Sequence, residues 1–355
     1  NDGSNDIFVT EMLPSDYKRL KSVTTFEDWD KYQYVVKNGY HHQFTRNVLH
    51  LNNSNNTFSE IGRFAGVEAS DWSWGALFYD MDNDGLKDLF IANGIYRDLT
   101  NQDYLQYVSN AEVVKSIVSN NKVDYKRLVE IIPSEAIPNH SYKNIDGIKF
   151  KDYEDSGLKI PSFSNGSAYG DIDNDGDLDL VVNNVNMPVF IFENTLDKKQ
   201  NYLKFKLHGS KKNINAIGSK IKVKTDKMTQ IQEVQPVRGF QSTVDIRPNF
   251  GIGNSTKADV EIIWPYGGKS LLLNVDANQE IELYEKNAKI DSENNSPLIS
   301  NPSNNKNSLF KKMEFIEPII HKENNYIDFN RERLIYHMCS TEGPKLSKGD
   351  INGDG

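Results

Sequence analysis

The sequence predicts a mainly β fold, made of repeated strand–loop–strand units with helical insertions and a separate β-sandwich. Two Asp-rich loops with one shared pattern each lead into a short β-rich run, at residues 89–92 and 180–183. Beyond Asn201, polar and apolar residues alternate with a period of two, which is typical of half-buried strands. Helix-compatible spacing is limited to two segments, so helices are expected only as insertions between strands.

The Asp-rich loop is part of a longer internal repeat. The two copies, Asp80-Met-Asp82-Asn-Asp84-Gly85-Leu-Lys-Asp88 and Asp171-Ile-Asp173-Asn-Asp175-Gly176-Asp-Leu-Asp179, match in pattern at an offset of 171 − 80 = 91 residues. Upstream, Gly75 and Gly166 keep this offset of 91, and Phe58 and Phe150 differ by 92. Because whole neighbourhoods recur together, each loop belongs to a repeated structural unit.

Both ends of the chain carry partial copies of the same loop. Asn1 to Val9 align with Asn83 to Ile91, which places Asp2 and Asp6 at the positions of Asp84 and Asp88. At the other end, Asp350, Asn352 and Asp354 match the first, third and fifth loop positions. We therefore expect a fragment of a longer protein, whose signal, anchor or catalytic domain lies elsewhere.

Two segments interrupt the β pattern with apolar residues at helical spacing. Asp16 to Lys37 and, more clearly, Asn101 to Ile132 contain few helix breakers. Pro133 and Pro138 follow the second segment and would end it. Both segments are predicted to be helical insertions.

The second half of the chain has a different organisation. Period-two alternation at residues 202–208, 220–225, 260–264 and 280–284, with Asn and Gly turns between, predicts a β-sandwich over residues 201–285. Residues 286–309 are rich in Asn, Ser and Pro and predict a linker. Residues 1–200 hold the repeats, and residues 310–355 begin a further, truncated set.

The carboxylate spacing in the loops suits calcium, which takes six to eight oxygen ligands. Acidic residues at positions 1, 3, 5 and 9 and the backbone carbonyl at position 7 can surround one ion, and Gly at position 6 permits the sharp turn. The predicted ligands are Asp80, Asp82, Asp84, the Leu86 carbonyl and Asp88 in one loop, and Asp171, Asp173, Asp175, the Asp177 carbonyl and Asp179 in the other. Without a cation, four carboxylates so close together would repel one another and raise their pKa values. The partial copies add Asp2, Asp6, Asp350, Asn352 and Asp354 to the predicted metal ligands.

An EF-hand is excluded, because that motif needs Glu at position 12 and flanking helices. Position 12 is Ile91 in the first loop and Val182 in the second, and both lie in predicted strands. The alternative to a metal site is a plain surface turn rich in Asp, Asn and Gly.

Two further clusters have simpler interpretations than a binding site. The aromatic residues Trp72, Trp74, Tyr79 and Tyr96 flank the first loop and would form either packed core or a sugar-stacking platform. The histidines His41, His42 and His50 favour ordinary packing or surface positions over a transition-metal site. For the aromatic residues, core packing is the favoured interpretation.

The composition and net charge of the chain exclude some classes of function. A formal charge of −9 argues against nucleic-acid binding, which needs a basic face. The single cysteine excludes an internal disulfide. That usually indicates a reducing compartment, but it also suits a secreted protein stabilised by metal, the interpretation favoured here. No apolar run reaches the roughly 20 residues that span a bilayer.

The loops and the strands before them resemble FG-GAP/VCBS repeats, the blades of integrin-α-like β-propellers. Residues 201–285 resemble an ASPIC/UnbV domain through Asn215-Ala-Ile-Gly218, Gln235-Pro-Val-Arg238-Gly239-Phe240, Phe250-Gly-Ile-Gly253 and Ile263-Trp264-Pro265. The combination is similar to large secreted or surface proteins of the Bacteroidetes type. This resemblance implies propeller blades stabilised by Ca²⁺ in the loops between the first two strands of each blade.

No nucleophile elbow, phosphate loop or zinc motif occurs in the sequence. We therefore expect a non-enzymatic, calcium-stabilised scaffold at the cell surface or outer membrane, which presents loops to a protein or glycan partner. The alternatives are a non-catalytic part of a secreted polysaccharide-degrading enzyme and an accessory subunit of an outer-membrane nutrient-uptake complex.

Overall fold

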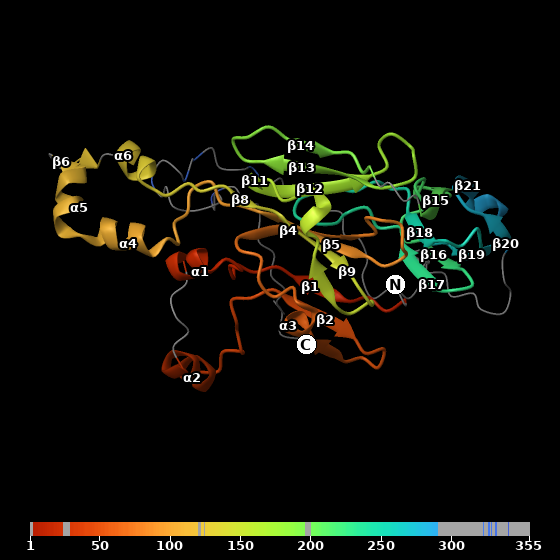
Figure 1. The fold of residues 1–355 in the computed structure, drawn as a ribbon, viewed down its shortest axis with the longest axis horizontal. Coiled ribbons are helices and arrows are strands. Elements are labelled where there is room, and N and C mark those ends of the chain that lie inside the picture. The colour runs from red at the N-terminus through yellow and green to blue at the C-terminus, as the bar shows by residue number, and fades with distance from the viewer. Residues whose placement is uncertain are drawn as a thin grey trace, which may run out of the picture. The chain divides into compact units, whose positions relative to one another are not determined.

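The computed structural model describes residues 3–23, 29–119, 122–123, 125–195 and 200–289, with isolated positions between 322 and 340 (Figure 1). The chain divides into two compact units, Asn1–Ser300 and Asn301–Gly355, and every element named below belongs to the first. These elements are mainly strands, which confirms the predicted fold class. No helix within the described ranges is both long and apolar enough to cross a membrane. Apart from the isolated positions, the further repeat set predicted at residues 310–355 lies outside the described residues.

Three larger antiparallel sheets lie within the described part of the first 195 residues. The first contains β1 (Ile7–Val9), β2 (Val48–Asn52) and β3 (Phe58–Glu60). The second contains β4 (Ser73–Tyr79), β5 (Asp88–Asn93), β9 (His140–Asn144) and β10 (Phe150–Asp152), and the third contains β12 (Ser164–Gly170), β13 (Asp179–Asn184) and β14 (Phe190–Phe192). A small sheet pairs β8 (Ile137–Pro138) with β11 (Pro161–Ser162). Within each of the three larger sheets, neighbouring strands follow one another in sequence order, so each is a meander.

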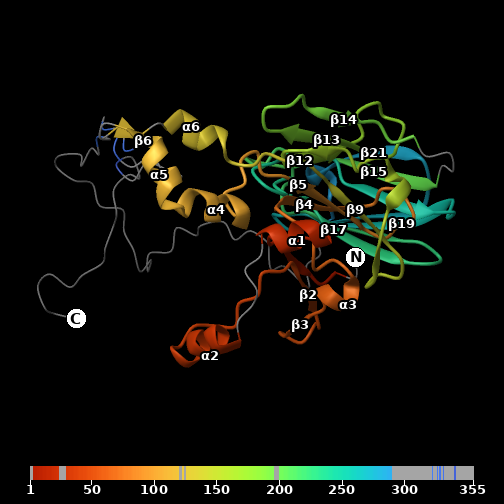
Figure 2. The same cartoon turned by 60° about the vertical axis from the view of Figure 1, so that its left-hand side comes forward.

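The second sheet lies between the other two, which explains why β5 is apolar without alternation. Leu89 and Ile91 pack toward the first sheet, in a cluster with Leu49. Phe90 and Ala92 point to the opposite face and pack with residues of the third sheet. Successive side chains of a strand point to opposite faces, so a strand with both faces buried needs apolar residues throughout. The second and third sheets lie side by side in both views (Figures 1 and 2).

The sequence repeat is also a repeat of backbone geometry. Strand register shifts between Ser73 and Ala76 in β4, and between Ser164 and Ser167 in β12. The offset between the two irregularities is 164 − 73 = 91 residues, the same as between the loops. Each Asp-rich loop therefore follows a bulged strand of the same shape.

Both predicted helical insertions are present. Between β1 and β2 lie α1 (Tyr17–Val23) and α2 (Trp29–Lys37), and a short α3 (Gly62–Ala65) follows β3. Between β5 and β9 lie α4 (Gln102–Ser109), α5 (Ala111–Ile117) and α6 (Tyr125–Glu130), with a hairpin of β6 (Val118–Ser119) and β7 (Lys122–Val123) after α5. The Asn101 side chain accepts a hydrogen bond from the Tyr104 N–H and so caps α4. A 3₁₀ turn, η1 (Glu154–Ser156), follows β10.

The region beyond Asn201 folds as two packed sheets. One has the order β18 (Asn249–Gly253), β15 (Asn201–His208), β21 (Gln279–Tyr284), and a 3₁₀ turn, η2 (Glu285–Asn287), follows it. The other has the order β17 (Thr229–Glu233), β16 (Lys220–Lys224), β19 (Lys257–Ile263), β20 (Lys269–Asp276). Alternate residues such as Phe205, Val223 and Ile262 point inward and form one buried core with Trp264. This sandwich shares one compact unit with the three blade-like sheets.

Candidate metal centres

Each Asp-rich loop joins the first two strands of its repeat. The first connects β4 to β5, and the second connects β12 to β13. In each loop, the residues at positions 1, 3 and 9 each contribute one carboxylate oxygen, and these three oxygens lie within 4.8 Å of one another. The residues are Asp80, Asp82 and Asp88 in the first loop, and Asp171, Asp173 and Asp179 in the second. Three of the four predicted carboxylates of each loop therefore converge on one point.

The fifth loop position is arranged differently from the prediction. Asp84 and Asp175 do not join the converging groups. Instead, Asp84 Oδ1 accepts from the Leu86 N–H at 2.7 Å, and Asp175 Oδ1 accepts from the Asp177 N–H at 3.1 Å. In this structure the position-5 carboxylate shapes the turn through the backbone of the residue that is predicted to offer a carbonyl.

The turn of each loop depends on two left-handed residues. Gly85 has φ +93° and Gly176 has φ +101°, as expected for the glycine at position 6. The preceding Asn83 and Asn174 also have positive φ, at +58° and +63°. Asn tolerates this conformation better than most residues, so the Asn of the repeat contributes to the turn.

The carboxylate at the ninth position connects the loop to a neighbouring segment of the chain through backbone hydrogen bonds. Asp88 accepts hydrogen bonds from the N–H groups of Met81 (2.9 Å) and Asn144 (2.8 Å). Asp179 does the same with Ile172 (2.8 Å) and Asn194 (2.9 Å). Both position-9 carboxylates therefore link the start of their own loop to the chain segment beside it.

The second loop contains buried carboxylate oxygens that have no hydrogen-bond donor among the described residues. They are Oδ1 of Asp171 and Oδ1 of Asp177, in residues that are only 2% and 7% exposed. A buried charged oxygen without a partner costs free energy unless a cation or donor satisfies it. These orphaned oxygens, with the convergence of hard oxygen ligands, fit a Ca²⁺ ion. Burial of the Asp177 side chain is a feature that the sequence did not indicate.

Electrostatics in both loops favour a bound cation. Burial raises the pKa of Asp80 well above its usual range, and burial together with Asp82 and Asp84 raises the pKa of Asp88 to about 7, despite two backbone donors. Burial and the neighbouring Asp175 raise the pKa of Asp177 to about 7 as well. A divalent cation would relieve both the burial cost and the mutual repulsion of these carboxylates.

Comparison with protein families gives two matches. A model of the FG-GAP-like repeat matches residues 1–91, and a model of the ASPIC and UnbV domain matches residues 209–290. The chain combines FG-GAP-like repeats with an ASPIC/UnbV domain. The first Asp-rich loop lies within the matched repeat, and the second lies beyond it with the same pattern. No curated protein matches the chain.

Two lysines outside the FG-GAP loops pair with the loop carboxylates. Lys143 of β9 forms an ion pair with Asp82 and lies 4.0 Å from Asp84. Lys204, on β15 beside the ASPIC/UnbV match, pairs with Asp171, and both side chains are almost fully buried. Neither lysine is detectable as a loop partner from sequence, because they lie about 60 and 30 residues from the carboxylates that they contact.

The partial loop copies are not assembled into metal clusters within the described residues. Asp6 is exposed, and its Oδ1 accepts from the Asn52 N–H at 2.8 Å. The remaining predicted ligands, Asp2, Asp350, Asn352 and Asp354, lie outside the described residues.

The aromatic residues near the first loop divide between core and surface. Tyr79 is buried and stacks on Tyr169 at a centroid distance of 4.9 Å. Trp74 and Trp72 are half-buried, and the Trp74 ring lies 4.9 Å from Phe240 of the ASPIC/UnbV domain. Packing therefore accounts for Tyr79, while Trp74 and Phe240 approach the surface together.

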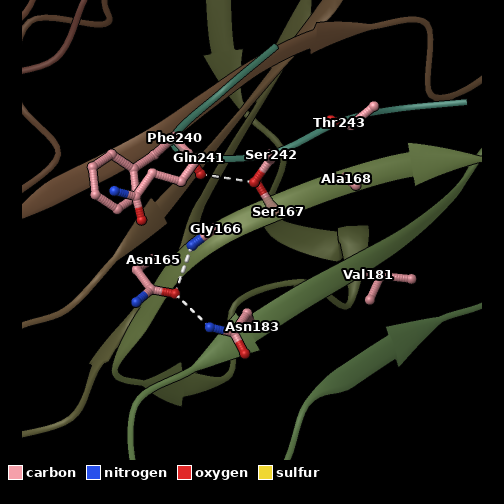
Figure 3. Close-up of a pocket in the computed structure, with 10 residues that line it drawn as sticks. All are labelled: Asn165, Gly166, Ser167, Ala168, Val181, Asn183, Phe240, Gln241, Ser242 and Thr243. Atoms are coloured by element: carbon pink, nitrogen blue, oxygen red, sulfur yellow. Dashed lines mark hydrogen bonds between the residues drawn. The ribbon is translucent and has the colours of Figure 1, made fainter. Parts of the chain in front are cut away.

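Beside Phe240 lies an open pocket of about 290 Å³ between β12 and the segment 240–243 (Figure 3). Its lining carries no charged side chain. Asn165 Oδ1 accepts from Asn183 Nδ2 at 2.9 Å and from the Gly166 N–H at 2.7 Å, which fixes the amide pair at one end. The hydroxyl of Ser167, another lining residue, is buried without a hydrogen-bond partner among the described residues.

Proposed function

We propose that this protein is a calcium-stabilised extracellular scaffold with a non-catalytic role. The observation that carries the proposal is the convergence of three carboxylates in each loop. The orphaned Oδ1 of Asp171 supports it. In the first loop the ion would be held by Asp80, Asp82 and Asp88, with Asp84 and the Leu86 carbonyl within the same turn. In the second loop the corresponding ligands are Asp171, Asp173 and Asp179, with Asp175 and the Asp177 carbonyl.

The bound ion would supply charge neutralisation and a fixed loop shape. Extracellular calcium is plentiful enough to fill sites of modest affinity, and sites of this kind bind in the range of about 10⁻⁴ to 10⁻³ M. Sites of modest affinity would therefore be filled outside the cell, and the FG-GAP-like match supports the proposal. The clustered carboxylates have a structural role in this account, so none is assigned to a reaction.

Calorimetric titration with Ca²⁺ tests the proposal. We expect at least two sites in the wild-type chain and the loss of one site in Asp88→Asn, since this change removes a converging carboxylate. Asp103→Asn is the matched control, because Asp103 is exposed on α4 and belongs to neither loop. Absence of calcium binding in the wild type, or equal stoichiometry in all three proteins, would refute the proposal.

For the partner, the observations favour a neutral glycan in the pocket of Figure 3. The lining combines amide groups, which donate and accept hydrogen bonds, with the ring of Phe240 and no charged side chain. Uncharged polar groups beside an aromatic face suit a sugar better than a charged ligand. A protein partner, a role within a polysaccharide-degrading enzyme and a place in an outer-membrane uptake complex are the alternatives.

A glycan array with the wild type and the variant Gln241→Ala tests the glycan assignment. Gln241 is exposed at the pocket, so its truncation should weaken binding at least tenfold without loss of folding. The exposed Gln279→Ala, in β21, is the control. No binding to any neutral glycan, or equal binding by Gln241→Ala, would leave a protein partner as the better assignment.

A further inference from the structure

The ASPIC/UnbV domain and its first strand cover the turns of both Asp-rich loops. Three glycines mark the contact, because each leaves no room for a Cβ atom. A Cβ on Gly85 would overlap Met228, one on Gly176 would overlap the Tyr202 ring, and one on Gly251 would overlap Asp80 and Asn83. Backbone of the loops and atoms of the sandwich are therefore in direct contact at both candidate metal centres.

Four of the hydrogen bonds across this junction end on three backbone carbonyls and one side chain of the loops. Arg247 donates to the Asp171 carbonyl and to Asn174 Oδ1, both at 3.1 Å. Asn249 Nδ2 donates to the Gly176 carbonyl at 3.1 Å, and the Gly253 N–H donates to the Asn83 carbonyl at 2.9 Å. These acceptors hold their positions only while the loops keep their turn geometry.

The two carboxylate oxygens of Asp171 have different surroundings, and Lys204 binds only one of them. The lysine ammonium and the Gly176 N–H both bind Oδ2, while Oδ1 is buried without a partner among the described residues. The ion pair is buried from solvent on both sides, with side-chain exposures of 4% for Lys204 and 0% for Asp171. Lys204 therefore orients Asp171 with one oxygen left for the cation.

We propose that cation binding in the loops fastens the ASPIC/UnbV domain to the FG-GAP-like repeats, with Lys204 as a positioning residue of the second centre. This inference rests on the proposed function, because it needs the loops to bind calcium. A cation holds the carboxylates together and thus holds the backbone carbonyls that Arg247, Asn249 and Gly253 contact. Loss of the cation leaves mutual repulsion among the carboxylates, which opens the turns and releases the domain. By linkage, docking of the domain strengthens cation binding by the same factor.

Amine labelling of the intact chain tests this proposal, with mass spectrometry as the readout. Lys204 is 3% exposed in the docked arrangement, whereas Lys206, on the same strand, is exposed and reports the intrinsic labelling rate. In Ca²⁺ we expect Lys206 to react and Lys204 to be protected. In EDTA we expect Lys204 to react at least tenfold faster, with Lys206 unchanged.

Amide exchange in β19, in the sandwich core, separates release of the domain from its unfolding. Protection of β19 that persists while Lys204 becomes reactive supports the proposal. Simultaneous loss of both protections contradicts it, because the cation would then stabilise the whole fold and not the junction. If calorimetry shows calcium binding and Lys204 stays protected in EDTA, the inference fails while the proposed function stands. If no calcium binds, the proposed function fails as well.

The variant Asp173→Ala tests the second centre separately. Asp173 is exposed, and its Oδ1 accepts a hydrogen bond from the Asp175 N–H within the loop at 3.2 Å. Its substitution therefore removes a candidate ligand without removing a side-chain hydrogen bond to the sandwich among the described residues. We expect Lys204 to react in Ca²⁺ as fast as the wild type reacts in EDTA. The exposed Asp155→Ala, between β10 and β12, is the control and should keep Lys204 protected. Protection of Lys204 in Asp173→Ala would contradict the role of the second loop.

Discussion

At the scale of single residues, each candidate metal centre depends on a few positions with one permitted geometry. The carboxylates at positions 1, 3 and 9 converge, and position 6 has the left-handed backbone that only glycine adopts without strain. Glycines with the same left-handed backbone have different neighbours, so the same substitution should reduce stability by different amounts at different glycines.

Gly176→Ala should destabilise the protein far more than Gly147→Ala. Both glycines have positive φ, so each substitution costs roughly 1–2 kcal/mol of backbone strain. Only at Gly176 would the new Cβ overlap a neighbour, the Tyr202 ring, while nothing lies within 4 Å at Gly147. We expect a further loss of about 1–3 kcal/mol for Gly176→Ala in urea unfolding. Equal losses of unfolding free energy in both variants would mean that the Tyr202 ring moves aside without destabilising the protein.

His140 should make stability depend on pH near neutrality. Burial lowers the pKa of His140 below its ordinary value of 6.5, and Asp152 opposes this only in part. The unfolded chain then binds the proton more tightly, so this contribution is fully present above about pH 6.5 and is lost as pH falls through the folded-state pKa. His140→Phe, which retains an aromatic ring beside Tyr142, should reduce the loss between pH 7.5 and 5.5, measured in saturating Ca²⁺. An unchanged pH dependence would show that His140 does not contribute.

The converging carboxylates could be located from the sequence because they are close together in the chain, whereas the residues that contact them could not, because those are distant in the chain. Spacing within nine residues is enough to bring positions 1, 3 and 9 together. Lys143, Lys204 and Asn194 reach the loops only through strand pairing and packing, which no local pattern encodes. The left-handed backbone of Asn83 and Asn174 could have been predicted, since Asn recurs at the fourth loop position and tolerates positive φ.

At the scale of elements, strands were easier to predict than the contacts that hold the helices. The continuous apolar run of β5 reflects burial of both faces of that strand, and the alternation in β16 reflects burial of one face. The predicted helix over 101–132 is divided by the hairpin of β6 and β7, which its apolar spacing did not show. Helix α1 is attached through Arg19, which pairs with Asp71 at 2.9 Å and Asp98 at 2.8 Å in a buried network.

Arg19→Met should loosen α1 and destabilise the protein by roughly 3–5 kcal/mol, because it leaves two buried carboxylates unpaired. Lys18→Met is the control, since Lys18 is 83% exposed and its contact with Glu135 is long at 3.8 Å. An exposed pair of this kind contributes about 0–1 kcal/mol. Chemical unfolding of both variants measures the difference. Similar stabilities would show that Asp71 and Asp98 find other partners.

At the scale of the whole molecule, the two recognisable parts form one compact unit through residue 300. The sequence indicated blades and a sandwich from different periodicities, and these patterns carry no information on how the two pack. The junction includes glycines, asparagines, Arg247 and the buried Lys204, whose contacts with the loops become apparent only in the folded structure. The Asp-rich loops lie at this junction, so under the proposed function a bound cation should influence both the repeats and the ASPIC/UnbV domain.

Thermal unfolding in Ca²⁺ and in EDTA tests whether calcium stabilises the folded protein. A ligand that binds only the folded state stabilises it by about 2.7 kcal/mol per site at a hundredfold excess over its Kd. We expect a Tm higher by several degrees in millimolar Ca²⁺ than in EDTA, with roughly half that difference in Asp88→Asn, which retains the second loop. Identical Tm values for the wild type in Ca²⁺ and in EDTA would contradict the proposed stabilisation by calcium.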